Sequence, residues 1–180
     1  MDRVDGDTLV AGELENLKEQ AKTKNKVTIV VFSGDLDRVL AAFNIAMGAA
    51  SMGMEATLFF TFWGLNVLKK NRAKNTGKGL MKKMLGWMNK GGTDRLKLSK
   101  FNMGGMGTWM MKKLMRRHKM PTVDEMIELA KGLGVKMVAC TITMGIMGIE
   151  KEALRPEIDS CAGVITYLAE AQESRVNLFI

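Results

Sequence analysis

KVTIVVFSGD, residues 26–35, is the stretch that indicates the fold class. Its first eight residues are β-branched or otherwise almost wholly apolar, which is typical of a strand buried on both faces, as in a parallel sheet. Gly34 and Asp35 predict a tight turn, and Asp35 stands where it can cap a following helix. The order of strand, turn and helix indicates one unit of an α/β fold.

The residues after this turn predict a helix and a second buried strand. Residues 35–53 (DLDRVLAAFNIAMGAASMG) carry Ala, Gly and Ser at positions that suit close packing on a sheet, and Gly53 ends the helix. The second strand is expected over 55–63 (EATLFFTFW), followed by a short helix over 64–70. Two strands joined through a helix within about forty residues imply a right-handed parallel crossover.

The pattern resumes in the last third of the chain. Pro121 and Thr122 favour the start of a helix, because a Thr-x-x-Glu arrangement can close its first turn. A loop rich in Met and Gly is expected between the third strand and the helix after it. The elements predicted here are a helix over 122–134, a strand over 135–140 (VKMVAC), a helix over 161–174 and a short last strand over 176–180.

Together these elements predict a doubly wound α/β fold. We expect a mainly parallel sheet of about four or five strands, with helices on both faces. Asp7 is placed to cap a first helix that reaches Ala21. The length of 180 residues suits a single domain over 1–180, with a helical excursion between the second and third strands.

That excursion, residues 69–119, is strongly basic. It holds sixteen Lys or Arg and one acid, Asp94, a net charge of +15, whereas the rest of the chain holds eleven basic and eighteen acidic residues, a net −7; the sum is the +8 of the whole chain. Residues 77–92 and 101–119 predict two short amphipathic helices with Met and Trp on one side and Lys and Arg on the other, and a glycine-rich hinge over 102–105 is expected before the second. Such helices are expected first as a cover on the domain or at a subunit interface, with a membrane surface or an acidic partner as the less favoured alternative. No nucleic-acid motif is present, so no nucleic acid is expected as a partner.

The composition argues against a membrane or secreted protein and against metal and cofactor sites. No run of about 18 apolar residues is present and the N-terminus lacks the apolar core of a signal peptide, so a cytoplasmic location with free thiols is expected. One histidine and two cysteines are too few for a structural zinc site, and we expect no metal. The glycine clusters match neither dinucleotide- nor phosphate-loop patterns, and no cofactor is expected.

The two cysteines are the candidates for chemistry. Cys140 ends an apolar strand, at the edge of the sheet where open α/β folds bind their ligands. Backbone N–H groups of a helical turn starting at Thr141 would favour its thiolate, although a buried, inert thiol is the plain alternative. Cys161 is the candidate second thiol, either exchanging with Cys140 or packed in the core, since only spatial geometry decides pairing. A Cu(I) site with Met thioethers is a third reading, but core packing explains the methionines more simply.

Several stretches resemble the DsrE/DsrF/DsrH-like family. They are SGDLDRVLAAFNIAMGAASMGMEATLFFTFWGLNVLKK (33–70), NMGGMGTWMMKKLM (102–115) and MVACTITMGIMGI (137–149), followed by GVITYL (163–168). The resemblance covers most of residues 26–171 and is most specific in TFWGLN and NMGGMGT. Within this family, the chain is similar to the larger members, which are called peroxiredoxin-like or are attached to CoA-disulfide reductases.

This resemblance implies a doubly wound fold, homo-oligomers and intracellular sulfur chemistry. Cys140 matches the family's persulfide-forming cysteine, so the chain would act as a sulfur carrier or sulfurtransferase with a donor or acceptor protein, or a small thiol, as partner. The residues expected around the thiol share positions in matching loops or at strand ends: Ser33, Gly34, Thr61, Phe62, Trp63, Asn102, Met103, Gly104, Thr141 and Met144. The alternative function is a non-catalytic oligomeric binding module whose basic segment contacts a membrane surface or an acidic partner.

Overall fold

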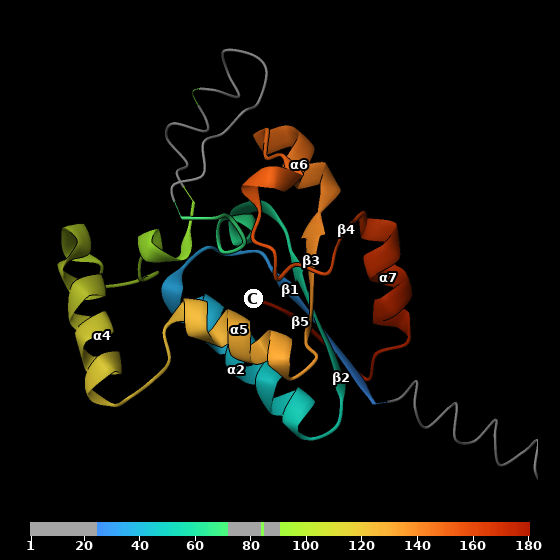
Figure 1. The fold of residues 1–180 in the computed structure, drawn as a ribbon, viewed down its shortest axis with the longest axis horizontal. Helices are drawn as coiled ribbons and strands as arrows, with labels where there is room; N and C mark the ends of the chain where they lie inside the picture. Colours follow the sequence, from blue (N-terminus) through green and yellow to red (C-terminus); the bar gives the residue numbers. More distant parts are fainter. Residues whose placement is uncertain (1–24, 72–83, 85–90) are drawn as a thin grey trace, which may run out of the picture.

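The computed structural model describes residues 25–71, 84 and 91–180. In this part of the chain, five strands form one sheet in the order β4-β3-β2-β1-β5, and every neighbouring pair is parallel (Figure 1). The strands are β1 (Lys26–Val31), β2 (Glu55–Phe60), β3 (Lys136–Cys140), β4 (Ser160–Ala162) and β5 (Val176–Phe179). The predicted α/β fold class, with a parallel sheet, is confirmed.

Helices lie on both sides of this sheet. Helices α2 (Leu36–Ser51) and α5 (Val123–Gly132) pack side by side on one face, and α7 (Val164–Gln172) lies on the other (Figure 1). Helix α6 (Thr141–Met147) follows β3 directly, and α4 (Met106–Arg117) stands at the side of the molecule. The short 3-10 helices are η1 (Phe62–Asn66), η2 (Thr93–Arg95), η3 (Met103–Gly105) and η4 (Lys151–Ala153).

The main hydrophobic core lies between the sheet and the α2–α5 layer. Successive side chains of a strand point to opposite faces, so alternate residues of β1, β2 and β3 enter this core. Ile29, Leu58 and Met137 meet Phe43 of α2 and Ile127 of α5 there, all fully buried. These strands are buried on both faces, which explains why their sequences are continuously apolar rather than alternating.

The opposite face carries a smaller cluster. Phe59, Val138 and Cys140 are buried in it, and Ala162 and Tyr167 pack against them. The rings of Phe59 and Tyr167 are tilted, with centroids 4.9 Å apart. Cys140 therefore belongs to the face covered by α7, not to the main core.

The predicted boundaries differ from the structure in the loop after β2. The strand predicted over 55–63 ends at Phe60, and the helix predicted over 64–70 is replaced by the earlier 3-10 turn η1. Beyond η1 the chain makes a turn at residues 67 and 68, and Lys69 then forms an antiparallel bridge with Leu154. Tertiary pairing across the chain thus overrides the local helical preference.

The segment after β3 differs as well. The expected loop contains a helix, α6, and the helix predicted over 161–174 begins only at Val164. Cys161 lies instead in β4, where it pairs in register with Ala139. The glycine-rich hinge expected over 102–105 is present, since Gly104 and Gly105 have positive φ values, and helix α4 begins directly after it at Met106. The predicted N-terminal helix and nearly all of the helix predicted over 77–92 lie outside the described residues.

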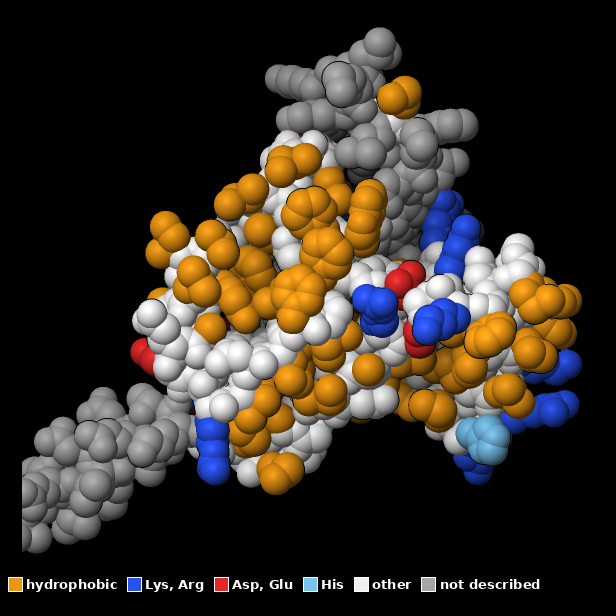
Figure 2. Space-filling model, turned by 180° about the vertical axis from the view of Figure 1, so that it is seen from behind, with side chains coloured by type: hydrophobic (Ala, Val, Ile, Leu, Met, Phe, Trp, Pro, Cys, Tyr) orange, Lys and Arg blue, Asp and Glu red, His pale blue; other side chains and the backbone are white. Residues whose placement is uncertain are grey.

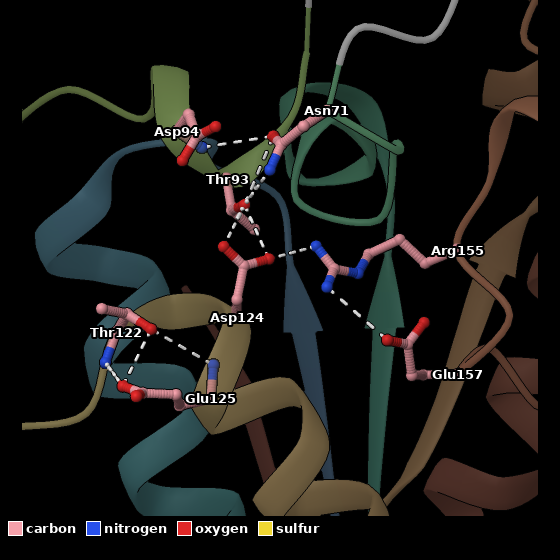
Figure 3. Close-up of polar contacts among 8 residues, drawn as sticks. All are labelled: Asn71, Thr93, Asp94, Thr122, Asp124, Glu125, Arg155 and Glu157. Atoms are coloured by element: carbon pink, nitrogen blue, oxygen red, sulfur yellow. Dashed lines mark hydrogen bonds and ion pairs between the residues drawn. The ribbon is translucent and has the colours of Figure 1, made fainter.

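A polar network, here called the Asp124 cluster, joins η2 to α5 and to the loop after η4 (Figure 3). The Thr93 hydroxyl donates a hydrogen bond to the Asp124 carboxylate at 2.8 Å and receives one from the Asn71 amide at 3.2 Å. Arg155 forms an ion pair with Asp124 and a second one, at 3.5 Å, with Glu157. The cluster fixes Asn71 and η2, which belong to the basic segment, to the α/β core.

Candidate functional site

Cys140 is the last residue of β3 and the residue that precedes α6. Its residue surface is 4% exposed, so the thiol lies at the end of the strand but beneath the surface. The loop that follows β2 begins with Thr61 at the same edge of the sheet, because β2 and β3 are parallel neighbours. The C-terminal ends of these two strands therefore position the residues around the thiol.

Two threonine hydroxyls converge on Cys140, and with it they are called here the Cys140 site. The hydroxyl oxygens of Thr61 and Thr143 are 2.9 Å apart, and both hydroxyls lie beside the thiol. The backbone N–H groups of Ile142 and Thr143, in the first turn of α6, also lie near the sulfur. The N–H of Phe62 donates to the Thr143 hydroxyl at 3.3 Å, which helps to orient it. The sulfur is thus surrounded by hydrogen-bond donors.

The surroundings of the thiol shift its pKa in both directions. Burial is the largest single influence and raises the pKa of Cys140, because a charged sulfur loses its hydration. The hydrogen bonds from Thr143, through both backbone and side chain, and from Thr61 and Ile142 lower it. Together they outweigh burial, so the pKa of Cys140 lies below its ordinary value. The thiolate, which is the nucleophilic form, is therefore more populated at a given pH than that of an ordinary cysteine.

Close packing of η1 against the end of β1 holds Thr61 in place. The Thr61 N–H donates to the carbonyl of Val31 at 3.1 Å, and the Gly64 N–H donates to the carbonyl of Phe32 at 2.9 Å. A Cβ atom at Gly64 would lie 2.0 Å from the Val31 carbonyl oxygen, so only glycine fits there. Phe62 adopts φ +44°, a conformation that costs a non-glycine residue energy and is common at functional sites.

The loop residues Phe62 and Trp63 form an apolar rim. Their side chains are 43% and 46% exposed, and the Phe62 ring stacks on Phe32 with centroids 5.3 Å apart. The predicted rim residues Ser33 and Gly34 support this loop rather than touch the thiol. The Ser33 hydroxyl donates to the Asp35 carboxylate at 2.8 Å, and a Cβ at Gly34 would lie 2.7 Å from the Trp63 carbonyl oxygen.

Residues 102–104, which were expected around the thiol, form the turn that precedes α4. The Asn102 side chain accepts a hydrogen bond from the Thr108 hydroxyl at 2.8 Å, and its carbonyl accepts from the N–H groups of Gly105 and Gly107. Met103 has φ +46° and is 68% exposed, and Gly104 also has a positive φ. Among the described residues, no hydrogen bond joins this segment to the Cys140 site.

Two residues expected after the cysteine point elsewhere, and one was missed. Thr141 is exposed, with its hydroxyl toward Gly163, and Met144 packs against the main core on the face opposite Cys140. Thr143, absent from the expected set, is buried and contacts the thiol. Thr143 is the third residue after Cys140, and in a helix that follows Cys140 the third residue lies beside the side chain of the N-cap residue. This spacing is the signal that could have identified it.

Cys161 lies on the other side of the sheet from Cys140. In the β3–β4 register Cys161 pairs with Ala139, whereas Cys140 pairs with Ala162, and partners share a face. Both thiols are free, and Cys161 packs against the main core. In the described part of the chain no three His, Cys, Asp or Glu side chains gather as metal ligands, and no helix is long and apolar enough to cross a membrane.

Comparisons with known proteins identify the family of this chain. The model of the DsrE/DsrF/DrsH-like family matches residues 23–179. The chain is 47% identical over 164 residues to the uncharacterised protein YrkE of Bacillus subtilis, covering 91% of this chain and 100% of YrkE. It is 31% identical over 163 residues to the sulfur carrier protein DsrE2 of Allochromatium vinosum, covering 87% of this chain and 99% of DsrE2. The chain belongs to the DsrE/DsrF/DrsH-like family.

Proposed function

We propose that this protein carries sulfur as a persulfide on Cys140 and passes it to the thiol of a partner protein or a small molecule. The observation that carries the proposal is the convergence of two hydroxyls and two backbone N–H groups on one buried thiol, which lowers its pKa. Membership of the family, and the name sulfur carrier given to DsrE2, support sulfur relay as the general role.

The chemistry needs two substitutions at sulfur. The Cys140 thiolate attacks the outer sulfur of a persulfide donor, the donor's S–S bond breaks, and the donor leaves as a thiolate. An acceptor thiolate then attacks the outer sulfur on Cys140, and Cys140 leaves as a thiolate. One S–S bond forms and one breaks in each step, so neither an oxidant nor a reductant is consumed.

The residues of the site have distinct parts in these steps. The hydroxyls of Thr61 and Thr143 and the N–H groups of Ile142 and Thr143 stabilise the anion of Cys140 before attack and after transfer. The apolar side chains of Phe62 and Trp63 restrict water around the outer sulfur. A partner thiol approaches across this rim, since the face behind Cys140 is covered by α7.

The intact mass after anaerobic incubation with a sulfane-sulfur donor tests the proposal. The parent protein is expected to gain the mass of one sulfur atom, and Cys140→Ser none. Cys161→Ser is the matched control, since it removes the other thiol and is expected to load like the parent. Loading of Cys140→Ser to the parent level would contradict the proposal.

The proposal extends to assembly, because an apolar face surrounds the Cys140 site. Figure 2 shows apolar side chains gathered over α6 and α7, and no residue of α7 is buried. The exposed apolar residues on these elements and on β5 are Ile142, Ile146, Val164, Ile165, Leu168, Val176 and Phe179. An exposed apolar face of this extent marks a protein interface, and further copies of this chain are its proposed cover. Light scattering should give a mass above that of one chain, reduced by Ile165→Asp; a monomeric parent would contradict this part.

A further inference from the structure

Helix α4 is attached to the rest of the molecule along one narrow side. Only Gly107, Thr108 and Met115 of its residues are buried. The Thr108 hydroxyl accepts a hydrogen bond from the Leu98 N–H at 2.9 Å and donates one to Asn102 at 2.8 Å, which anchors the first turn. The helix stands away from the sheet (Figure 1), so most of its circumference faces outward.

The outward side of α4 is apolar to an unusual degree. Met106, Trp109, Met110 and Leu114 are 59%, 58%, 56% and 41% exposed. Met106, Met110 and Leu114 recur every four residues and form one stripe along the helix. Phe101, just before the helix, is 83% exposed. Contiguous exposed apolar side chains of this size mark a contact surface.

The same side of the molecule is positively charged and is not neutralised from within. Between Asp94 and Asp124 the chain has no acidic residue and eight basic ones. None of the eight forms an ion pair with an acid in the described part of the chain. The eight residues are Arg95, Lys97, Lys100, Lys112, Lys113, Arg116, Arg117 and Lys119.

Apolar and basic side chains alternate around α4 rather than occupying separate faces. At 100° per residue, Lys113 and Arg117 fall in the sector between Trp109 and Met110. The Lys113 ammonium lies 5.0 Å from the centroid of the Trp109 ring. A surface that covers this side must therefore offer negative charge and an apolar layer at the same place.

We infer that α4 binds an anionic lipid surface, lying flat on it as a peripheral contact. Lipid phosphates pair with the Lys and Arg side chains, while the Met, Leu and Trp side chains enter the adjoining acyl region. Lysine and arginine stems can lie along apolar groups while their charges stay in the headgroup layer, and tryptophan favours this boundary. Nucleic acid offers phosphates without an apolar layer, and an acidic peptide needs a groove, whereas the outer side of a single helix is convex.

Vesicle sedimentation tests this inference with the full chain. We expect binding to vesicles of phosphatidylcholine mixed with phosphatidylglycerol, and little binding to phosphatidylcholine alone. Binding should fall steeply toward about 1 M salt, where the screening length is about 3 Å. No binding to the anionic vesicles at low salt would overturn the inference.

A charge variant of α4 assigns the contact to this helix. Lys113→Gln/Arg116→Gln/Arg117→Gln is expected to weaken binding by roughly fivefold for each cation removed. The matched control is Lys136→Gln/Lys151→Gln/Arg175→Gln, which removes three exposed cations from other elements. Equal loss in the two variants, or none in the α4 variant, would contradict a role for α4.

Trp109 gives a readout that reports insertion rather than charge. The emission of the parent minus that of Trp109→Phe isolates its signal from the other two tryptophans. A shift of this signal to shorter wavelength on anionic vesicles is expected, and no shift would contradict burial of the apolar stripe. Capture of poly-glutamate by a chain that ignores vesicles would overturn the lipid assignment in favour of an acidic protein partner.

Discussion

The Cys140 site and the Asp124 cluster are two polar centres in the described part of the chain, and they are built in opposite ways. In the Asp124 cluster, a carboxylate is matched by a guanidinium and a hydroxyl, so donors and acceptors of opposite charge meet. In the Cys140 site, hydroxyls and N–H groups converge on a sulfur for which the described residues provide no cationic partner. The first arrangement holds segments together, and the second adjusts the reactivity of one atom.

This difference separates stability from chemistry. Arg155 has a side chain only 13% exposed, so it depends on Asp124 and Glu157 for charge compensation. The Thr61 and Thr143 hydroxyls also share a hydrogen bond, so one hydroxyl proton lies between them and the other is available to the sulfur. Changes in the cluster should therefore affect unfolding, and changes in the Cys140 site should affect sulfur loading.

The largest effect is expected from Asp124→Ala. It leaves the Arg155 charge partly uncompensated and the Thr93 hydroxyl without its carboxylate, so the free energy of unfolding should fall by about 2 kcal/mol. Sulfur loading per folded molecule should not change. Urea unfolding measures the first quantity and intact mass the second. Asp124→Asn, which keeps an acceptor but removes the charge, should lose less stability; a loading defect in folded Asp124→Ala would break the comparison.

Thr143→Val should show the converse pattern. It removes one hydroxyl donor from the sulfur at nearly constant volume, so the pKa of Cys140 should rise and the loading rate near neutral pH should fall about tenfold. The free energy of unfolding should change by only about 1 kcal/mol. Stopped-flow loading with mass detection measures the rate. Thr143→Ser keeps the hydroxyl and is the matched control; a parent-like rate in Thr143→Val would remove the hydroxyl from the account.

The pH dependence of loading sharpens the same point. The rate follows the thiolate fraction, so it should decline as pH falls through the pKa of Cys140, which lies below the ordinary thiol value. In Thr143→Val the pKa is raised, so the decline should occur at higher pH than in the parent. Rates measured across a pH series give both midpoints. Coinciding midpoints would mean that these hydrogen bonds do not control the thiol.

The smallest effect is expected from Cys161→Ser. Cys161 lies on the face opposite Cys140 and packs against the main core, so no exchange between the two thiols is part of the proposal. Loading should match the parent, and the free energy of unfolding should change by about 1 kcal/mol or less. Loss of sulfur transfer in this variant, with loading intact, would show that Cys161 acts as a second thiol.

Much of the fold was predictable because its elements carry strong local patterns. The apolar runs of β1, β2 and β3 predict strands buried on both faces, and the structure confirms them. The capping box formed by Thr122 and Glu125 at the start of α5 is also as expected. Strand β4 was not predictable, since its three residues have no pattern of their own and are defined by pairing with β3.

The candidate site was only partly predictable for a similar reason. The position of Cys140 at a strand end follows from the sequence, but the partners of its sulfur depend on how two loops meet in space. Thr61 was expected and lies beside the thiol, whereas Thr143 was not expected, because α6 was taken for a loop. Met144 packs against the main core instead of the thiol. Its direction depends on the helical geometry of α6, which the sequence pattern did not predict.

Whether a thiol can remove the added mass decides if Cys140 carries sulfur as a persulfide. A persulfide and a sulfinic acid add nearly the same mass, one sulfur atom or two oxygen atoms, but only the persulfide is released by a thiol. The loaded parent, freed of donor, is treated anaerobically with a small thiol and its mass measured again. We expect the protein to return fully to its unloaded mass, with the sulfur recovered on the acceptor thiol. A mass that stays raised would show oxidation of Cys140 rather than sulfur carriage.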